Sequence, residues 1–162
     1  MTILELRQIL KKDEEVAKLI TPSARNEIYM DINGDGIADF AFINSSCDLT
    51  GKGDVDTFAI DLGNDGEFDL YLRDSDGNFI SDEIIFFKDG EEEPVIKTHP
   101  EKSREMIEGV LSGPAQIAFN TLGNLAKGES NVEEFKKGMS EYINAARLAL
   151  RKLQEAYMAQ QK

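Results

Sequence analysis

The sequence has little of what most catalytic and metal–thiolate sites require. Its 162 residues include one cysteine, one histidine and no tryptophan. A single cysteine excludes an intramolecular disulfide and a zinc site built from several cysteines. We therefore expect a protein that is not an enzyme. Cys47 has no basic neighbour to activate it and is interpreted as structural, and His99, before Pro100, as a capping or exposed residue.

Basic residues are also scarce. The chain has 18 Lys and Arg against 31 Asp and Glu, a net charge of −13. A nucleic-acid binder is excluded, because phosphate recognition needs a basic surface. No apolar run approaches the roughly 20 residues of a membrane-spanning helix, so we expect no membrane insertion. The charges near the N-terminus argue against a signal peptide there.

The acidic residues are concentrated in one segment. Residues 27–93 contain 19 acidic and three basic residues, a net charge of −16, and the rest of the chain has a net charge of +3. Because these acids are interleaved with apolar residues, the segment does not resemble a solvated acidic tail.

Aligning the aspartates indicates an internal repeat of four units. The units are DINGDGIADFAFI from Asp31, DLTGKGDVDTFAI from Asp48, DLGNDGEFDLYLR from Asp61 and DSDGNFISDEIIF from Asp74. Their starts are 17, 13 and 13 residues apart. Each unit has Asp at positions 1 and 9, followed by an apolar-rich run of about four residues.

The first unit has the oxygen donors that a calcium loop needs. Calcium binds about six to eight oxygens, and glycine permits the sharp turn that brings alternate residues inward. The predicted ligands are Asp31, Asn33, Asp35, Asp39 and the backbone carbonyl of Ile37.

The third unit keeps most of this set. Its predicted ligands are Asp61, Asp65, Asp69 and the carbonyl of Glu67. Gly63 stands at position 3, so water or the adjacent Asn64 would have to supply that oxygen.

The other two units depart further from the pattern. The fourth unit offers Asp74, Asp76, Asn78, Asp82 and the carbonyl of Ile80, with Phe79 in place of the turn glycine. The second unit has Asp48, Thr50 and Asp56, but Lys52 would repel a cation at position 5. We predict two to three calcium ions and none in the second unit. The alternative is that these Asp-Gly and Asn-Gly pairs are ordinary hairpin turns.

The residues after position 9 distinguish between calcium-loop families. An EF-hand needs a glutamate at position 12 and flanking helices. That position holds Phe42, Leu72 or Ile85 in the first, third and fourth units, and short strand-like runs follow. The units therefore resemble the strand–loop–strand calcium sites of FG-GAP and VCBS repeats, over about a third of the chain. The resemblance implies ligands at positions 1, 3, 5 and 9 and the carbonyl at 7. A propeller is not expected, since its blades need about four strands each.

The remaining patterns predict an α+β fold. A helix is predicted over 2–20, strands over 28–30, 40–43, 57–60, 70–72, 84–87 and 95–96, and helices over 100–111, 114–126 and from 130 onward. We expect a small antiparallel β-meander packed with an N-terminal helix and a C-terminal three-helix segment. Segments 1–99 and 100–162 are expected to pack as one compact unit.

The last predicted helix carries an apolar stripe. Ser130 and Glu133 form a predicted capping box. Apolar or small residues recur at positions 132, 135, 139, 142, 146, 149 and 153. The stripe either packs within the molecule, which the small Ala146 and Ala149 favour, or forms a coiled coil or partner surface.

Three functions remain open at this stage. The first is a calcium-binding protein in which the ions stabilise Asp-rich loops for structural, adhesion or interaction purposes. The second is a protein–protein interaction module that acts through the C-terminal helices, with calcium only structural. The third is a carboxylate-dependent hydrolase, which the lack of tryptophan and the ligand pattern disfavour. Calcium chemistry favours an extracellular or cell-surface location, and the missing signal peptide opposes it.

Overall fold

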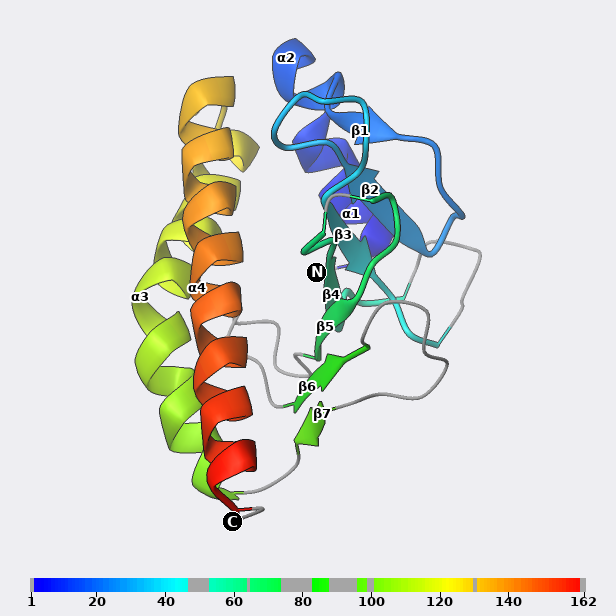
Figure 1. The fold of residues 1–162 in the computed structure, drawn as a ribbon. Helices are drawn as coiled ribbons and strands as arrows, with labels where there is room; N and C mark the ends of the chain where they lie inside the picture. The colour runs from blue at the N-terminus through cyan, green and yellow to red at the C-terminus, as the bar shows by residue number, and fades with distance from the viewer. Residues whose placement is uncertain are drawn as a thin grey trace.

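A computed structural model shows an antiparallel sheet with two long helices along one face (Figure 1). The structure describes residues 2–46, 53–63, 65–73, 83–87, 96–98, 101–129 and 131–160. Within these residues the architecture is α+β, as the sequence predicted.

The strands of the described residues follow one another across the sheet in chain order. They are β1 (Ile20–Thr21), β2 (Glu27–Met30), β3 (Phe40–Ile43), β4 (Thr57–Ile60), β5 (Leu70–Arg73), β6 (Glu83–Phe86) and β7 (Ile96–Thr98). Each pairs antiparallel with the next, so the sheet is a meander. The sequence predicted six of them within a residue or two and missed β1.

One face of the sheet is apolar because large apolar side chains alternate with smaller or polar ones along β2 to β5. Across β2 to β5, Ile28, Phe42, Phe58 and Leu72 occupy paired positions, and all are buried. This row forms the core against the helices. A slip of one residue in any strand would turn these side chains away from the core.

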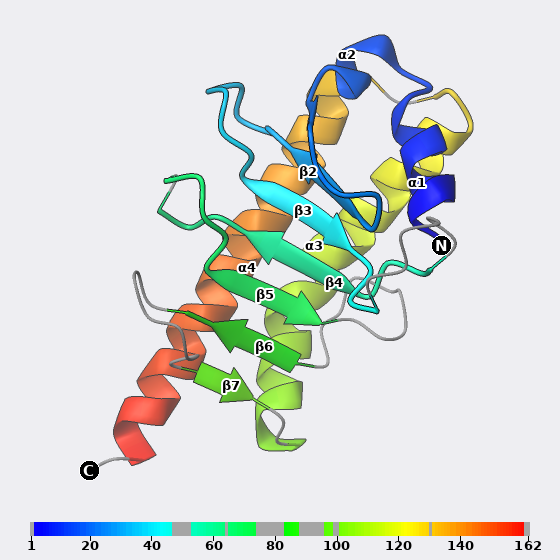
Figure 2. The same ribbon diagram turned by 90° about the vertical axis from the view of Figure 1, so that its right-hand side faces the viewer.

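The two long helices, α3 (Glu101–Ala126) and α4 (Val132–Gln160), lie side by side behind this face (Figure 2). Tyr142 of α4 is fully buried and packs edge-on against Phe40 and Phe58, with ring centroids 6.3 and 5.9 Å away. Such edge-to-face contacts add to the burial of apolar area. The aromatic cluster therefore joins α4 to the centre of the sheet.

The apolar stripe of α4 is buried within the molecule. Phe135, Met139, Tyr142, Ala146, Ala149 and Leu153 are all buried. Intramolecular packing, rather than a free coiled-coil surface, is therefore the use of this stripe. The helix begins at Val132, where the Asn131 Oδ1 accepts the Glu134 N–H at 3.0 Å. Ser130 of the predicted capping box lies outside the described residues.

The predicted helix break at Ser112-Gly113-Pro114 is wrong. Helix α3 runs through Pro114 without interruption, so the C-terminal segment has two helices instead of three. Proline removes one backbone donor and normally ends or kinks a helix. Here Leu111, Ala115 and other residues of the same face are buried, and this packing holds the helix together across the proline.

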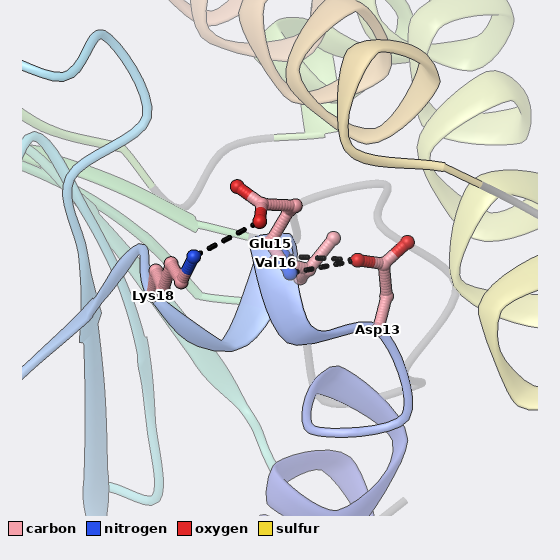
Figure 3. A network of polar contacts seen from close by, with 4 residues as sticks. All are labelled: Asp13, Glu15, Val16 and Lys18. Carbon is pink, nitrogen blue, oxygen red and sulfur yellow. Dashed lines mark hydrogen bonds and ion pairs between the residues drawn. The ribbon is translucent and has the colours of Figure 1, made fainter.

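The N-terminal helix is shorter than predicted. The expected helix over 2–20 is divided into α1 (Ile3–Leu10) and α2 (Glu14–Ala17). Asp13 causes the division: its backbone is extended, and its Oδ1 accepts the N–H groups of Glu15 at 2.9 Å and Val16 at 3.3 Å (Figure 3). An aspartate at an N-cap starts a new helix in this way. The exposed Lys18–Glu15 ion pair, at 3.0 Å, follows on α2.

Candidate metal centre

The first predicted calcium loop joins β2 to β3. Asp31 follows the last residue of β2, and Asp39 precedes the first residue of β3. The Asp39 N–H donates to the Met30 carbonyl at 3.0 Å, and the Asp31 N–H donates to the Leu19 carbonyl at 2.8 Å. Backbone hydrogen bonds therefore fix both ends of the loop to the sheet.

The carboxylate of Asp31 lies inside the turn. Its Oδ1 accepts the N–H groups of Gly34 at 2.9 Å and Asp35 at 3.2 Å, and its Oδ2 accepts that of Gly36 at 2.8 Å. Gly34 and Gly36 have φ values of +78° and +87°, a region that glycine adopts without strain. The positive φ values turn the backbone around the carboxylate, so that consecutive amides point toward it.

Asp39 closes the loop from the other end. Its two carboxylate oxygens accept the N–H groups of Ile32 at 2.7 Å and Asn33 at 3.2 Å. The residue is only 9% exposed. Burial raises the pKa of the Asp39 carboxyl against the lowering effect of the backbone hydrogen bonds, and the charge of Asp31 adds to the rise. A nearby cation would offset this penalty.

The loop between β4 and β5 contains the same arrangement around its first aspartate. Asp61 is 2% exposed, and its carboxylate accepts the N–H groups of Asp65 at 3.3 Å and Gly66 at 2.8 Å. Gly66 has a φ of +89°, close to that of Gly36 in the same position of the first loop. The two turns therefore have the same local design.

The end of the loop 61–69 also matches the end of the loop 31–39. The Asp69 Oδ1 accepts the Leu62 N–H at 2.8 Å, as Asp39 does for Ile32. The Asp65 Oδ1 accepts the Glu67 N–H at 3.0 Å, the counterpart of the 2.9 Å bond between Asp35 and Ile37. Thus positions 1, 5 and 9 accept corresponding backbone amides in both loops.

The two loops lie at the same end of the sheet (Figure 2). The Asp61 N–H donates to the Asp39 carbonyl at 3.2 Å. The Phe68 ring packs edge-on against Tyr29 of β2, with centroids 5.0 Å apart. The repeat pattern did not predict these contacts, and the aromatic Phe68 at position 8 of the loop 61–69 was the available signal.

The loop between β4 and β5 also contacts helix α4, a contact that the repeat pattern did not predict. The Arg147 guanidinium of α4 donates to the Leu62 carbonyl at 3.2 Å. This bond joins the loop to the helical layer across 85 residues of chain.

The second repeat unit is described only in part, and the described residues of its loop, 53–56, lie at the opposite end of the sheet. Asp56 accepts the Ser45 N–H at 2.9 Å and the Ser45 Oγ–H at 2.6 Å. Its carboxylate therefore secures the β3–β4 connection. Asp48, Thr50 and Lys52 lie outside the described residues.

The loop of the fourth unit and two other candidate residues lie outside the described residues. Asp74, Asp76, Asn78, Ile80 and Asp82 all fall in 74–82, outside the described residues. The same holds for Cys47 and His99. Their predicted roles stay predictions.

The donor chemistry of the two loops suits a hard cation. Each loop contributes carboxylate and carbonyl oxygens, and an ionised carboxylate has about four lone-pair sites, of which Asp31 uses three for amides. In the described part of the chain, however, no three His, Cys, Asp or Glu side chains are grouped as a metal site. Binding of an ion would therefore require the acidic side chains of each loop to come closer together.

Comparisons with known proteins do not identify a family. No protein-family model, curated protein or solved structure matches the chain. The assignment of function therefore depends on the loops themselves.

Among the described helices, none is long and apolar enough to cross a membrane.

Proposed function

We propose that the protein is a non-enzymatic calcium-binding protein whose ions bind the loops 31–39 and 61–69. The predicted ligands are those of the first and third units, and the fourth unit would supply a third site. The resemblance to FG-GAP and VCBS loops supports calcium as the ion. The role of the ions would be to stabilise Asp-rich loops for a structural, adhesion or interaction purpose.

The observation that carries this proposal is the shared hydrogen-bond pattern of the two loops. Asp31 and Asp61 each accept amides from positions 5 and 6, and Asp39 and Asp69 each accept the amide of position 2. An ordinary two-residue hairpin turn does not need nine residues or an acid at both ends. In each loop the carboxylates of positions 1, 5 and 9 therefore lie around one turn.

Electrostatics supports the same conclusion. Residues 27–93 carry a net charge of −16, and four aspartates of the two loops flank neighbouring strands at one end of the sheet. Mutual repulsion among such carboxylates destabilises the fold, and divalent cations reduce it. Calcium binding would therefore be coupled to the stability of this end of the sheet. Removing calcium should loosen the loops while α3 and α4 persist.

The alternative, an interaction module acting through the C-terminal helices, has less support. The apolar stripe that suggested it is buried against the sheet and α3. No observation on the described residues favours the hydrolase alternative. A protein partner that binds elsewhere on the helices stays a separate prediction.

The proposal is tested by NMR of the isotope-labelled, chelator-treated protein during calcium addition. We expect the amide resonances of Gly36 and Gly66 to shift, while that of Gly138 in α4 does not. Asp61→Asn should remove the shift at Gly66 and leave that at Gly36.

Asp56→Asn provides the matched control, because it removes the same charge at the opposite end of the sheet. This variant should leave both shifts intact. Unchanged Gly36 and Gly66 resonances at millimolar calcium would show that the loops are metal-free turns.

A further inference from the structure

A cavity of about 400 Å³ lies between α1, α3 and the strands β3 and β4. None of the residues that line it is a predicted calcium ligand, so it is separate from the proposed calcium site. Its described lining is apolar except for one acid, and the side chains that form most of its walls are Leu6, Ile9, Phe42, Phe58, Phe119 and Leu122. Cavities of roughly 300–1,000 Å³ with such walls are typical of small-molecule sites.

Hydrogen bonds at both ends of α1 hold this helix in place beside the cavity. At the start, the Ile3 N–H donates to the Gly53 carbonyl at 3.0 Å. Beyond the end, the Lys12 Nζ donates to the Ala126 carbonyl, the last residue of α3, at 2.7 Å. Both bonds oppose a shift of α1 into the cavity.

The α3 wall leaves room for an occupant. A Cβ added to Gly123 would meet no atom within 4 Å. The neighbouring Phe119 is 49% exposed, which is high for an aromatic side chain that also lines a cavity. An apolar molecule in the cavity would cover part of this ring and gain the free energy of burying it.

One charged side chain lines the cavity. Glu5 of α1 alone carries a charge among the described residues that line the cavity. It is exposed, so it stands where the cavity meets the solvent. A carboxylate at this place attracts a cation and repels an anion.

We propose that this cavity binds a small amphiphile with an apolar chain or ring and a cationic amine end. The apolar part lies among the aromatic and aliphatic walls, and the amine faces Glu5. The proposal is independent of calcium binding.

The test uses the full-length protein and the neutral dye N-phenyl-1-naphthylamine, whose fluorescence rises in apolar surroundings. We expect the dye to bind and decylamine to displace it at about a three- to fivefold lower concentration than decanoate, the effect of one solvent-exposed charge pair. Glu5→Gln should remove most of this preference. Glu14→Gln, which removes the same charge from α2 outside the cavity, should leave it intact.

A cavity-filling variant locates the binding site. Gly123→Leu places a side chain in the open space and removes a helix-interior glycine, so it should keep the fold while abolishing dye binding. Ile117→Ala, an exposed apolar residue outside the lining, should bind the dye as the wild type does. The proposal is overturned if the wild type does not bind the dye, if folded Gly123→Leu binds it undiminished, or if Glu5→Gln and Glu14→Gln have equal effects.

Discussion

Asp39 shows how one residue serves both the fold and the candidate site. Its carboxylate holds the amides of Ile32 and Asn33, yet burial makes its charged form unfavourable. The same residue is thus a structural acceptor without calcium and a predicted ligand with it.

The raised pKa of Asp39 predicts how acid affects the calcium-free protein. Because the folded state binds this proton more tightly than the unfolded chain, the contribution of Asp39 to stability falls as pH rises from about 3.8 through its folded pKa. In an NMR titration we expect the Asp39 carboxyl to titrate above 3.8 without calcium and at a lower pH with it. A midpoint at or below 3.8 without calcium would contradict this account of its burial.

Gly66 tests the backbone conformation that the candidate loop requires. Its φ of +89° is unfavourable for alanine, so Gly66→Ala should lower the free energy of unfolding by about 1–2 kcal/mol. Gly63→Ala is the matched control in the same loop, because Gly63 has no positive φ and an added Cβ meets only Asp65 at 3.8 Å. Urea unfolding should show little change for the control, and equal effects would mean that the loop does not depend on this conformation.

At the scale of elements, local patterns predicted the strands well. β3 and β4 have the predicted bounds, because an apolar run with a turn on each side leaves few alternatives. Helix α3 was predicted less well, since Gly113 and Pro114 favour a break locally. Packing of the helix on α4 and the sheet outweighs that local preference, and no local pattern contains this information.

Pro114 offers a direct test of this conflict. Replacing it by alanine restores a backbone donor and removes the ring from the interior of α3, so Pro114→Ala should stabilise the protein by about 1–3 kcal/mol. Ser112→Ala, in the same turn, is the control and should change stability by less than about 0.5 kcal/mol. A lower urea midpoint for Pro114→Ala would show that the proline has a structural role in α3.

At the scale of the whole molecule, the meander determines which loops meet. Consecutive connections of an antiparallel meander lie at alternate ends, so the loops of the first and third units come together at one end. The repeat pattern suggested individual ligands, which stay predictions, but not this pairing of the loops, which depends on strand order. The cavity beside α1 was also not predictable, because residues from distant parts of the chain form it.

Tyr142 joins the helical layer to the sheet and should dominate their association. Its ring is fully buried against Phe40 and Phe58, so Tyr142→Ala should cost about 3–5 kcal/mol through the lost contacts and the cavity left behind. The exposed Arg151 on the same helix provides a control, and Arg151→Ala should be nearly neutral. If urea unfolding gave similar values for both variants, the aromatic cluster would not be what holds the layers together.

The central claim, calcium binding by the Asp-rich loops, is tested most directly by calorimetric titration of the chelator-treated protein. We expect two to three calcium sites with dissociation constants from micromolar to millimolar and no comparable binding of magnesium, which demands stricter octahedral geometry. Asp31→Asn combined with Asp61→Asn should remove two of these sites. The absence of calcium binding in the wild-type protein, or undiminished stoichiometry in the double variant, would contradict the account.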